Sequence, residues 1–161
     1  MADAFLKITG PDIKGESTDD AHKDWIEINS FQHGMGQAVK PASSTGGRTA
    51  SRVSMSEFTV SKPTDLASLE MQHHCCVGTH FKEVLVQLHQ ASGEKHKYYE
   101  IKLSDVIISS LSTSSSGDKP CESVSFNYGR ITWEYTPIKH DGTQGKKVGH
   151  MGWNLETNKE L

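Results

Sequence analysis

Residues 73–80 gather the side chains that most readily bind a soft metal ion. His73, His74, Cys75 and Cys76 are consecutive, and His80 follows after a short gap. Neighbours on a helix point about 100° apart, so only His73 with Cys76, or Cys76 with His80, would share a face. A structural zinc site needs a second ligand pair at a finger-like spacing, and none follows. We therefore predict no metal site, and a metal-dependent hydrolase remains a third alternative.

A second polar group lies in residues 12–28, DIKGESTDDAHKDWIEI. Its carboxylates and histidine could in principle bind a metal ion or act as an acid–base pair. An EF-hand loop, however, needs oxygens at its first, third and fifth positions and glycine at its sixth. This segment does not match, so we interpret it as a solvated loop that leads into a strand. The polar residues concerned are Asp12, Glu16, Asp19, Asp20, His22 and Asp24.

Three glycine- or serine-rich stretches partly resemble sequence motifs for nucleotide binding or for a catalytic serine, but none matches its motif in full. Gly34-Met35-Gly36 lacks the third glycine of a dinucleotide fingerprint, and Pro41 opposes the helix that should follow. Residues 142–147 fail the P-loop spacing, and residues 115–117 do not form a Gly-x-Ser-x-Gly elbow. We therefore predict no catalytic residue, no cofactor and no enzymatic activity.

Length and composition favour one domain spanning residues 1–161. Hydrophobic residues make up only 34% of the chain, which suggests polar surfaces on more than one side. A net charge of −3 argues against a nucleic-acid partner, since such binding needs a basic face. No run of 18 apolar residues and no cleaved signal peptide is recognisable, so we expect no membrane insertion. Three cysteines, two of them adjacent, fit a reducing compartment.

The elements expected to position these residues are mostly strands. Period-two alternation predicts strands near residues 4–9, 25–32, 52–61, 84–88, 99–111 and 124–135, with a bulge near residues 56–57 and a parity switch at Gly129. One α-helix is expected over roughly residues 64–78, capped by Thr64 and ended by Gly78, with Cys76 and Val77 facing the core. Residues 33–50 and 140–152 read as long loops. The fold expected is mainly β, an antiparallel β-barrel or sandwich of two sheets with one helix.

Several short motifs, taken in order, resemble the Hcp family, the haemolysin-coregulated tube subunits of type VI secretion systems. Any one of them is weak, but together they cover nearly the whole chain at matching length. They are Phe5-Leu6-Lys7-Ile8, Lys14-Gly15-Glu16-Ser17, His22, Trp25-Ile26-Glu27-Ile28, Val53-Ser54-Met55, the helix ending near Gly78, Tyr99-Glu100-Ile101, Val106 to Ser110, Glu122-Ser123-Val124 and Gly152-Trp153-Asn154.

The resemblance implies a β-barrel-like domain that forms homohexameric rings. By the same resemblance, the rings stack into a tube inside a contractile sheath, a VgrG spike caps the tube, and small effectors travel in the lumen. The subunit would assemble in the bacterial cytoplasm and then be secreted without a cleaved signal peptide. The cysteines and the His73-His74 pair match no feature of the family pattern.

Given this resemblance, we expect roles for four sets of residues. The family-signature loop comprises Lys14, Gly15, Glu16, Ser17 and His22, whose polar groups are expected to cap backbone groups and contact neighbouring segments. Gln32 is expected to face the lumen, the alternative being that it is an ordinary polar strand end. The C-terminal contact segment is Gly152, Trp153 and Asn154. The expected ring-stacking loop contains Lys40, Ser43, Ser44, Thr45, Gly46, Gly47 and Arg48.

A monomeric binding module is the main alternative. A β-sandwich could bind carbohydrate by stacking sugar rings on Trp25, Trp133 or Trp153. An aromatic content of 7% is unremarkable, and Trp133 alternates like a packing residue.

Overall fold

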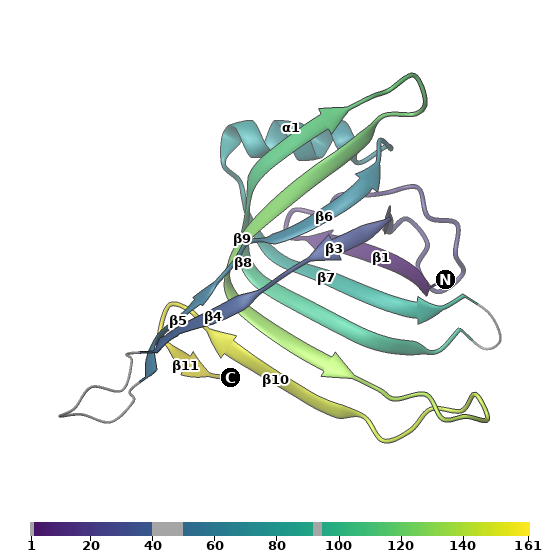
Figure 1. Ribbon diagram of the computed structural model, residues 1–161. Helices are drawn as coiled ribbons and strands as arrows, with labels where there is room; N and C mark the ends of the chain where they lie inside the picture. Colours follow the sequence, from purple (N-terminus) through teal and green to yellow (C-terminus); the bar gives the residue numbers. More distant parts are fainter. Residues whose placement is uncertain (1, 40–49, 92–94) are drawn as a thin grey trace.

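The computed structural model describes residues 2–39, 50–91 and 95–161, and within them it confirms a mainly β, antiparallel fold with one helix (Figure 1). No helix in these ranges is both long and apolar enough to cross a membrane. The helix α1 spans Ser68–Val77. The strands are β1 (Ala2–Thr9), β2 (Ile26–Ile28), β3 (Ser30–Gln32), β4 (Met35–Val39), β5 (Ala50–Met55), β6 (Phe58–Pro63), β7 (His80–Gln90), β8 (Lys97–Ser114), β9 (Cys121–Tyr135), β10 (Val148–Asn154) and β11 (Lys159–Glu160).

The long hairpin of β8 and β9 organises the strands. The first half of β9 pairs with β6 and its second half with β10, while β8 continues the sheet through β7 and β1 to β2. β2 leads through Asn29 into β3, which pairs with β6, so the pairings return to β9. Strands therefore surround one hydrophobic core, as expected for a sandwich. β4 and β5 pair only with each other and form a separate ribbon.

The predicted switch at Gly129, where the inward-facing positions of the strand change parity, is confirmed and also occurs in the neighbouring strand β8. In β9 the core side changes from Tyr128 to Ile131, and in β8 it changes from Leu103 to Val106. The register on either side of these steps is unbroken, so Asp105 and Gly129 lie opposite each other. Asp105 adopts a left-handed backbone conformation with φ of 53°. Both strands therefore bend at the same level, which lets the sheet curve around the core.

The helix begins later and faces the other way than its sequence suggests. Its N-cap is Ala67, so the prediction that Thr64 caps the helix was wrong, whereas Gly78 ends it in a left-handed conformation as expected. Met71 is fully buried, but Cys76 and Val77 are exposed, which contradicts the prediction that they face the core. The small residues Ala67 and Ser68 are buried together with Met71 on the inward side.

Four predicted boundaries also change. Residues 25–32 form two short strands, because β2 pairs with β1 and β3 with β6. Residues 52–61 contain a break between β5 and β6 instead of a bulge, since these strands belong to different sheets. The predicted loop 33–50 contains β4 and the start of β5, and the predicted loop 140–152 contains most of β10.

Candidate assembly surfaces

The family-signature loop is built into the body of the domain. Gly15 and Ser17 are buried, and their amides donate to the carbonyls of Asp24 and Trp25 at 2.8 and 3.0 Å. A Cβ on Gly15 would lie 2.7 Å from the Ile26 Cα, so only glycine fits this close approach. The loop therefore holds β2 in place, while Lys14 and Glu16 remain exposed.

His22 anchors the other end of this loop. Its ring is only 4% exposed and stacks on Phe5 at a centroid distance of 4.4 Å. Nδ1 lies 2.7 Å from an Asp19 carboxylate oxygen, and Nε2 lies 2.9 Å from the Gln87 Oε1. The hydrogen bond from His22 lowers the pKa of the Asp19 carboxyl. His22 thus packs inside the domain, and both of its ring nitrogens have polar partners there.

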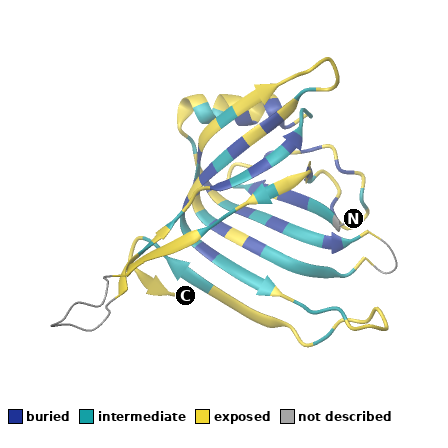
Figure 2. Ribbon diagram, viewed as in Figure 1, coloured by how far each residue is buried: buried dark blue, intermediate teal, exposed yellow. Residues whose placement is uncertain are grey.

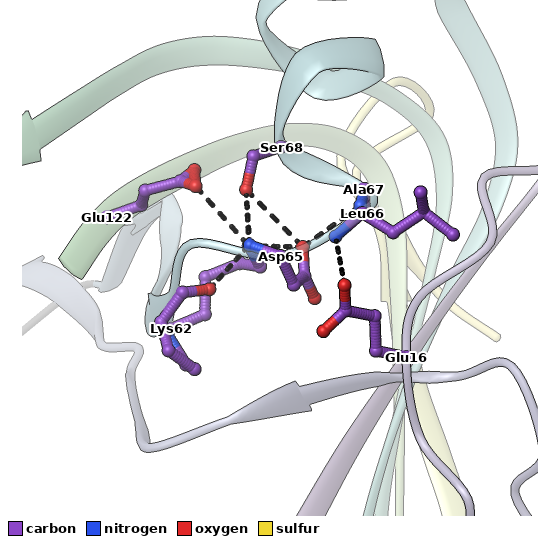
Figure 3. A network of polar contacts seen from close by, with 8 residues as sticks. Glu16, Lys62, Asp65, Leu66, Ala67, Ser68 and Glu122 are labelled. Atoms are coloured by element: carbon purple, nitrogen blue, oxygen red, sulfur yellow. Dashed lines mark hydrogen bonds and ion pairs between the residues drawn. The ribbon is translucent and has the colours of Figure 1, made fainter. Parts of the chain in front are cut away.

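A buried ion network fixes the start of α1 (Figure 3). The Lys62 side chain is fully buried, and its Nζ donates to the Asp65 carboxylate at 2.9 Å and to the Ser68 Oγ at 3.2 Å. The Glu122 carboxylate, directly across the β6–β9 pair, lies 3.6 Å from Nζ. Glu16 reaches the same region and accepts a bond from the Leu66 amide at 3.1 Å. The signature loop, two strands and the helix are therefore joined at one point.

Sequence reasoning missed Lys62, although one signal was present. Phe58, Val60 and Lys62 share the inward parity of β6, and this periodicity places the lysine in the core. Only the pairing of β6 with β9 shows that Glu122 lies opposite.

The ribbon of β4 and β5, here called the arm, extends away from the body (Figures 1 and 2). All five residues of β4 are exposed. Its base is held where the Tyr128 hydroxyl donates to the Ser56 carbonyl at 2.9 Å and accepts from the His33 Nε2 at 3.0 Å. Burial raises the pKa of Tyr128 to about 12, so this anchor stays protonated near neutral pH.

The remaining predicted contact residues occupy different parts of the chain. Gln32 is exposed on β3, opposite Thr59 of β6. Trp153 packs partly against the core, and the Asn154 Oδ1 accepts bonds from the backbone amides of Glu156 and Thr157. The predicted ring-stacking residues 40–48 lie outside the described residues.

The His/Cys cluster does not assemble into a centre. His74 Nδ1 lies 2.8 Å from the Thr79 hydroxyl, Cys75 packs against the core, and Cys76 faces solvent. Among residues 2–39, 50–91 and 95–161, no three His, Cys, Asp or Glu side chains are arranged to hold a metal ion. Nothing in this arrangement suggests a nucleophile paired with a base.

The tryptophans offer little flat surface for stacking a sugar. Trp25, Trp133 and Trp153 are each only partly exposed, and the latter two pack against the core. The Lys7 ammonium lies over the Trp25 ring at 5.6 Å from its centroid, and His22 meets the same ring edge-on.

Comparison with known proteins identifies the family of the chain. The model of the family described as "Type VI secretion system effector, Hcp" matches residues 5–135. A protein named hcp1 from Pseudomonas aeruginosa is 31% identical over 159 residues, covering 97% of this chain and 96% of its own length.

Solved structures give the same answer for the fold. One, described as a type six secretion system protein, is 33% identical, with a TM-score of 0.93 and full coverage of both chains. Hcp1 from Salmonella typhimurium is 26% identical, with a TM-score of 0.79 and full coverage of both chains. The chain therefore belongs to the Hcp family of type VI secretion system proteins.

Proposed function

We propose that this protein is a structural subunit of the type VI secretion tube and acts by self-assembly, without catalysis. Six copies form a ring, rings stack into a hollow tube, and the tube is exported from the bacterial cytoplasm. The observation that carries the proposal is the family match over residues 5–135, together with nearly full-length similarity to hcp1.

The surface of the protomer supports self-association. Large apolar side chains are exposed in three places: on the arm, on α1 and near β10. Exposed apolar groups of this kind commonly mark contacts between proteins. A ring needs two different surfaces that meet head to tail, and one protomer with several separate apolar surfaces meets that requirement.

Partners and site roles follow from the same proposal. The VgrG spike would cap the tube, a contractile sheath would surround it, and small effectors would occupy the lumen. Gln32 would face that lumen, residues 40–48 would contact the next ring, and residues 152–154 would contribute a further contact.

Light scattering coupled to size-exclusion chromatography, with negative-stain imaging, tests the assembly. We expect a species of six times the subunit mass and rings with an open centre. A compact monomer at every concentration and salt would refute the proposal.

Two variants test the site roles. Deletion of residues 40–48 should preserve hexamers and abolish stacking, so long tubes formed by the deletion would contradict the stacking role. Replacing Gln32 with arginine should preserve rings and reduce effector co-purification, whereas undiminished co-purification would remove Gln32 from the lumen.

A further inference from the structure

The outward side of α1 is an unpartnered apolar surface. It comprises Leu66, Leu69, His73, Cys76 and Val77, which we call the outer helix face. Leu66, Leu69 and Val77 are 63%, 76% and 64% exposed, and Met71, on the opposite side of the helix, is fully buried. A soluble helix normally turns its apolar stripe inward, so this inverted arrangement points to a protein partner.

The arm has one apolar face of its own. Register pairs Met35 with Met55 and Gln37 with Val53, and paired residues of antiparallel strands project to the same side. Val39 shares the parity of Met35 and Gln37, and Met35 and Val39 are 55% and 52% exposed. We call this side the apolar arm face. An isolated two-stranded ribbon is marginally stable in water, so the arm needs a covering surface.

The reverse side of the arm already has a neighbour within the protomer. Arg52, which lies on the side opposite Met35 and Gln37, donates to the Leu155 carbonyl at 2.8 Å. The arm and α1 lie at opposite ends of the protomer (Figure 1), so the two apolar faces cannot meet within one copy.

The two faces match in length and polarity. The ten residues of α1 span about 15 Å at about 1.5 Å per residue, and Leu66 lies just before them. The five residues of β4 span about 17 Å at about 3.4 Å per residue. Neither set of residues includes an acidic side chain, a lysine or an arginine, but the exposed carboxylate of Glu70 borders Leu66 and Val77, so the contact must leave Glu70 in solvent.

The other exposed apolar surface fits the arm less well. Val148 and Met151 of β10 are exposed, but they lie beside Lys147 and His150, and Lys147 pairs with Glu134 at 3.2 Å. Covering that surface with an uncharged ribbon would remove water from Lys147 and Glu134 and offer them no new hydrogen-bond partner.

We propose that the apolar arm face of one copy packs on the outer helix face of a second copy. This inference rests on the proposed self-assembly and names two surfaces that carry it. Because the two faces differ and lie at opposite ends, the contact is heterologous and joins copies head to tail.

Cys76 provides a cross-linking probe within the outer helix face. In a parent with Cys75→Ala and Cys121→Ala, Gln37→Cys places a second thiol on the apolar arm face. Ser54→Cys places it on the reverse side of the same ribbon and is the matched control. After mild oxidation, non-reducing gels should show a ladder of linked chains for Gln37→Cys and severalfold less linkage for Ser54→Cys. The ladder's upper limit shows whether the contacts close at six copies or continue along a column.

Equal linkage by the two variants, linkage only into dimers, or no linkage by Gln37→Cys would overturn the proposal. A charge substitution gives an independent readout: Leu69→Lys should lower the mass of the assembly in light scattering, whereas Gln72→Lys at the edge of the face should not. If wild-type protein assembles and Leu69→Lys assembles equally well, this inference fails and the proposed function stands. If wild-type protein stays monomeric, the proposed function itself fails.

Discussion

Substitution of Lys62 by methionine tests the ion network that fixes the start of α1. Methionine preserves most of the side-chain volume but removes the cation that faces Asp65 at 2.9 Å and Glu122 at 3.6 Å. The Glu122 side chain is fully buried, and neither of its carboxylate oxygens has a hydrogen-bond partner, so it would lose its compensating charge. Removing one partner of a buried ion pair costs about 3–5 kcal/mol.

The expected loss corresponds to a fall in Tm of about 6–20 °C for a chain of this size. Urea and thermal unfolding, followed by circular dichroism at one protein concentration, would measure it, with light scattering to verify equal oligomeric states. Lys102→Met is the matched control. Its ammonium is 46% exposed and lies 3.5 Å from a Glu83 carboxylate oxygen, so its removal should cost less than about 1 kcal/mol.

A double substitution separates charge from packing. If the loss comes from an uncompensated carboxylate, adding Glu122→Gln to Lys62→Met should recover part of the stability. The reasoning would be refuted if Lys62→Met cost no more than Lys102→Met, or if the double variant were less stable than the sum of its single changes.

Three further outcomes follow from the structure. Gly15→Ala should destabilise the fold by about 1–3 kcal/mol, because its Cβ would lie 2.7 Å from the Ile26 Cα; unchanged urea unfolding would contradict this close packing. Tyr128→Phe should lose about 1 kcal/mol and increase amide exchange at Ser56, whose carbonyl would lose its donor; unaltered exchange would show that the arm base does not need this bond. Burial lowers the pKa of His89 below 6.5, so the folded state binds fewer protons, and the free energy of unfolding should decrease as the pH falls below about 6.5. His89→Gln should flatten that fall, and an identical pH profile for the variant would exclude this origin.

Much of the fold can be predicted from the sequence because strand formation depends on local alternation. The inward positions of β9 before and after Gly129 and the helix end at Gly78 follow from side-chain periodicity and capping chemistry. The ordered motifs from Phe5 to Trp153 also identify the Hcp family, since their order and spacing are visible without coordinates.

Strand boundaries near the arm depend on partners that are distant in sequence. Residues 52–61 read as one interrupted strand, yet β5 pairs with β4 and β6 pairs with β3 and β9. A local pattern gives the alternation of each piece but does not give the sheet to which it belongs.

The orientation of α1 is decided only by the tertiary structure. Its sequence offers Leu66, Leu69 and Val77 as an apolar stripe, but the folded protein buries Ser68 and Met71 instead. Ser68 is held inward by the buried ammonium of Lys62, which donates to its hydroxyl, and a long-range contact of this kind leaves no mark in helical periodicity. The sequence by itself therefore determined the long strands of the body, the end of the helix and the family. The packing of α1 on the sheet decided which helix face remains free for another copy, because burying the Lys62 network fixes the rotation of the helix.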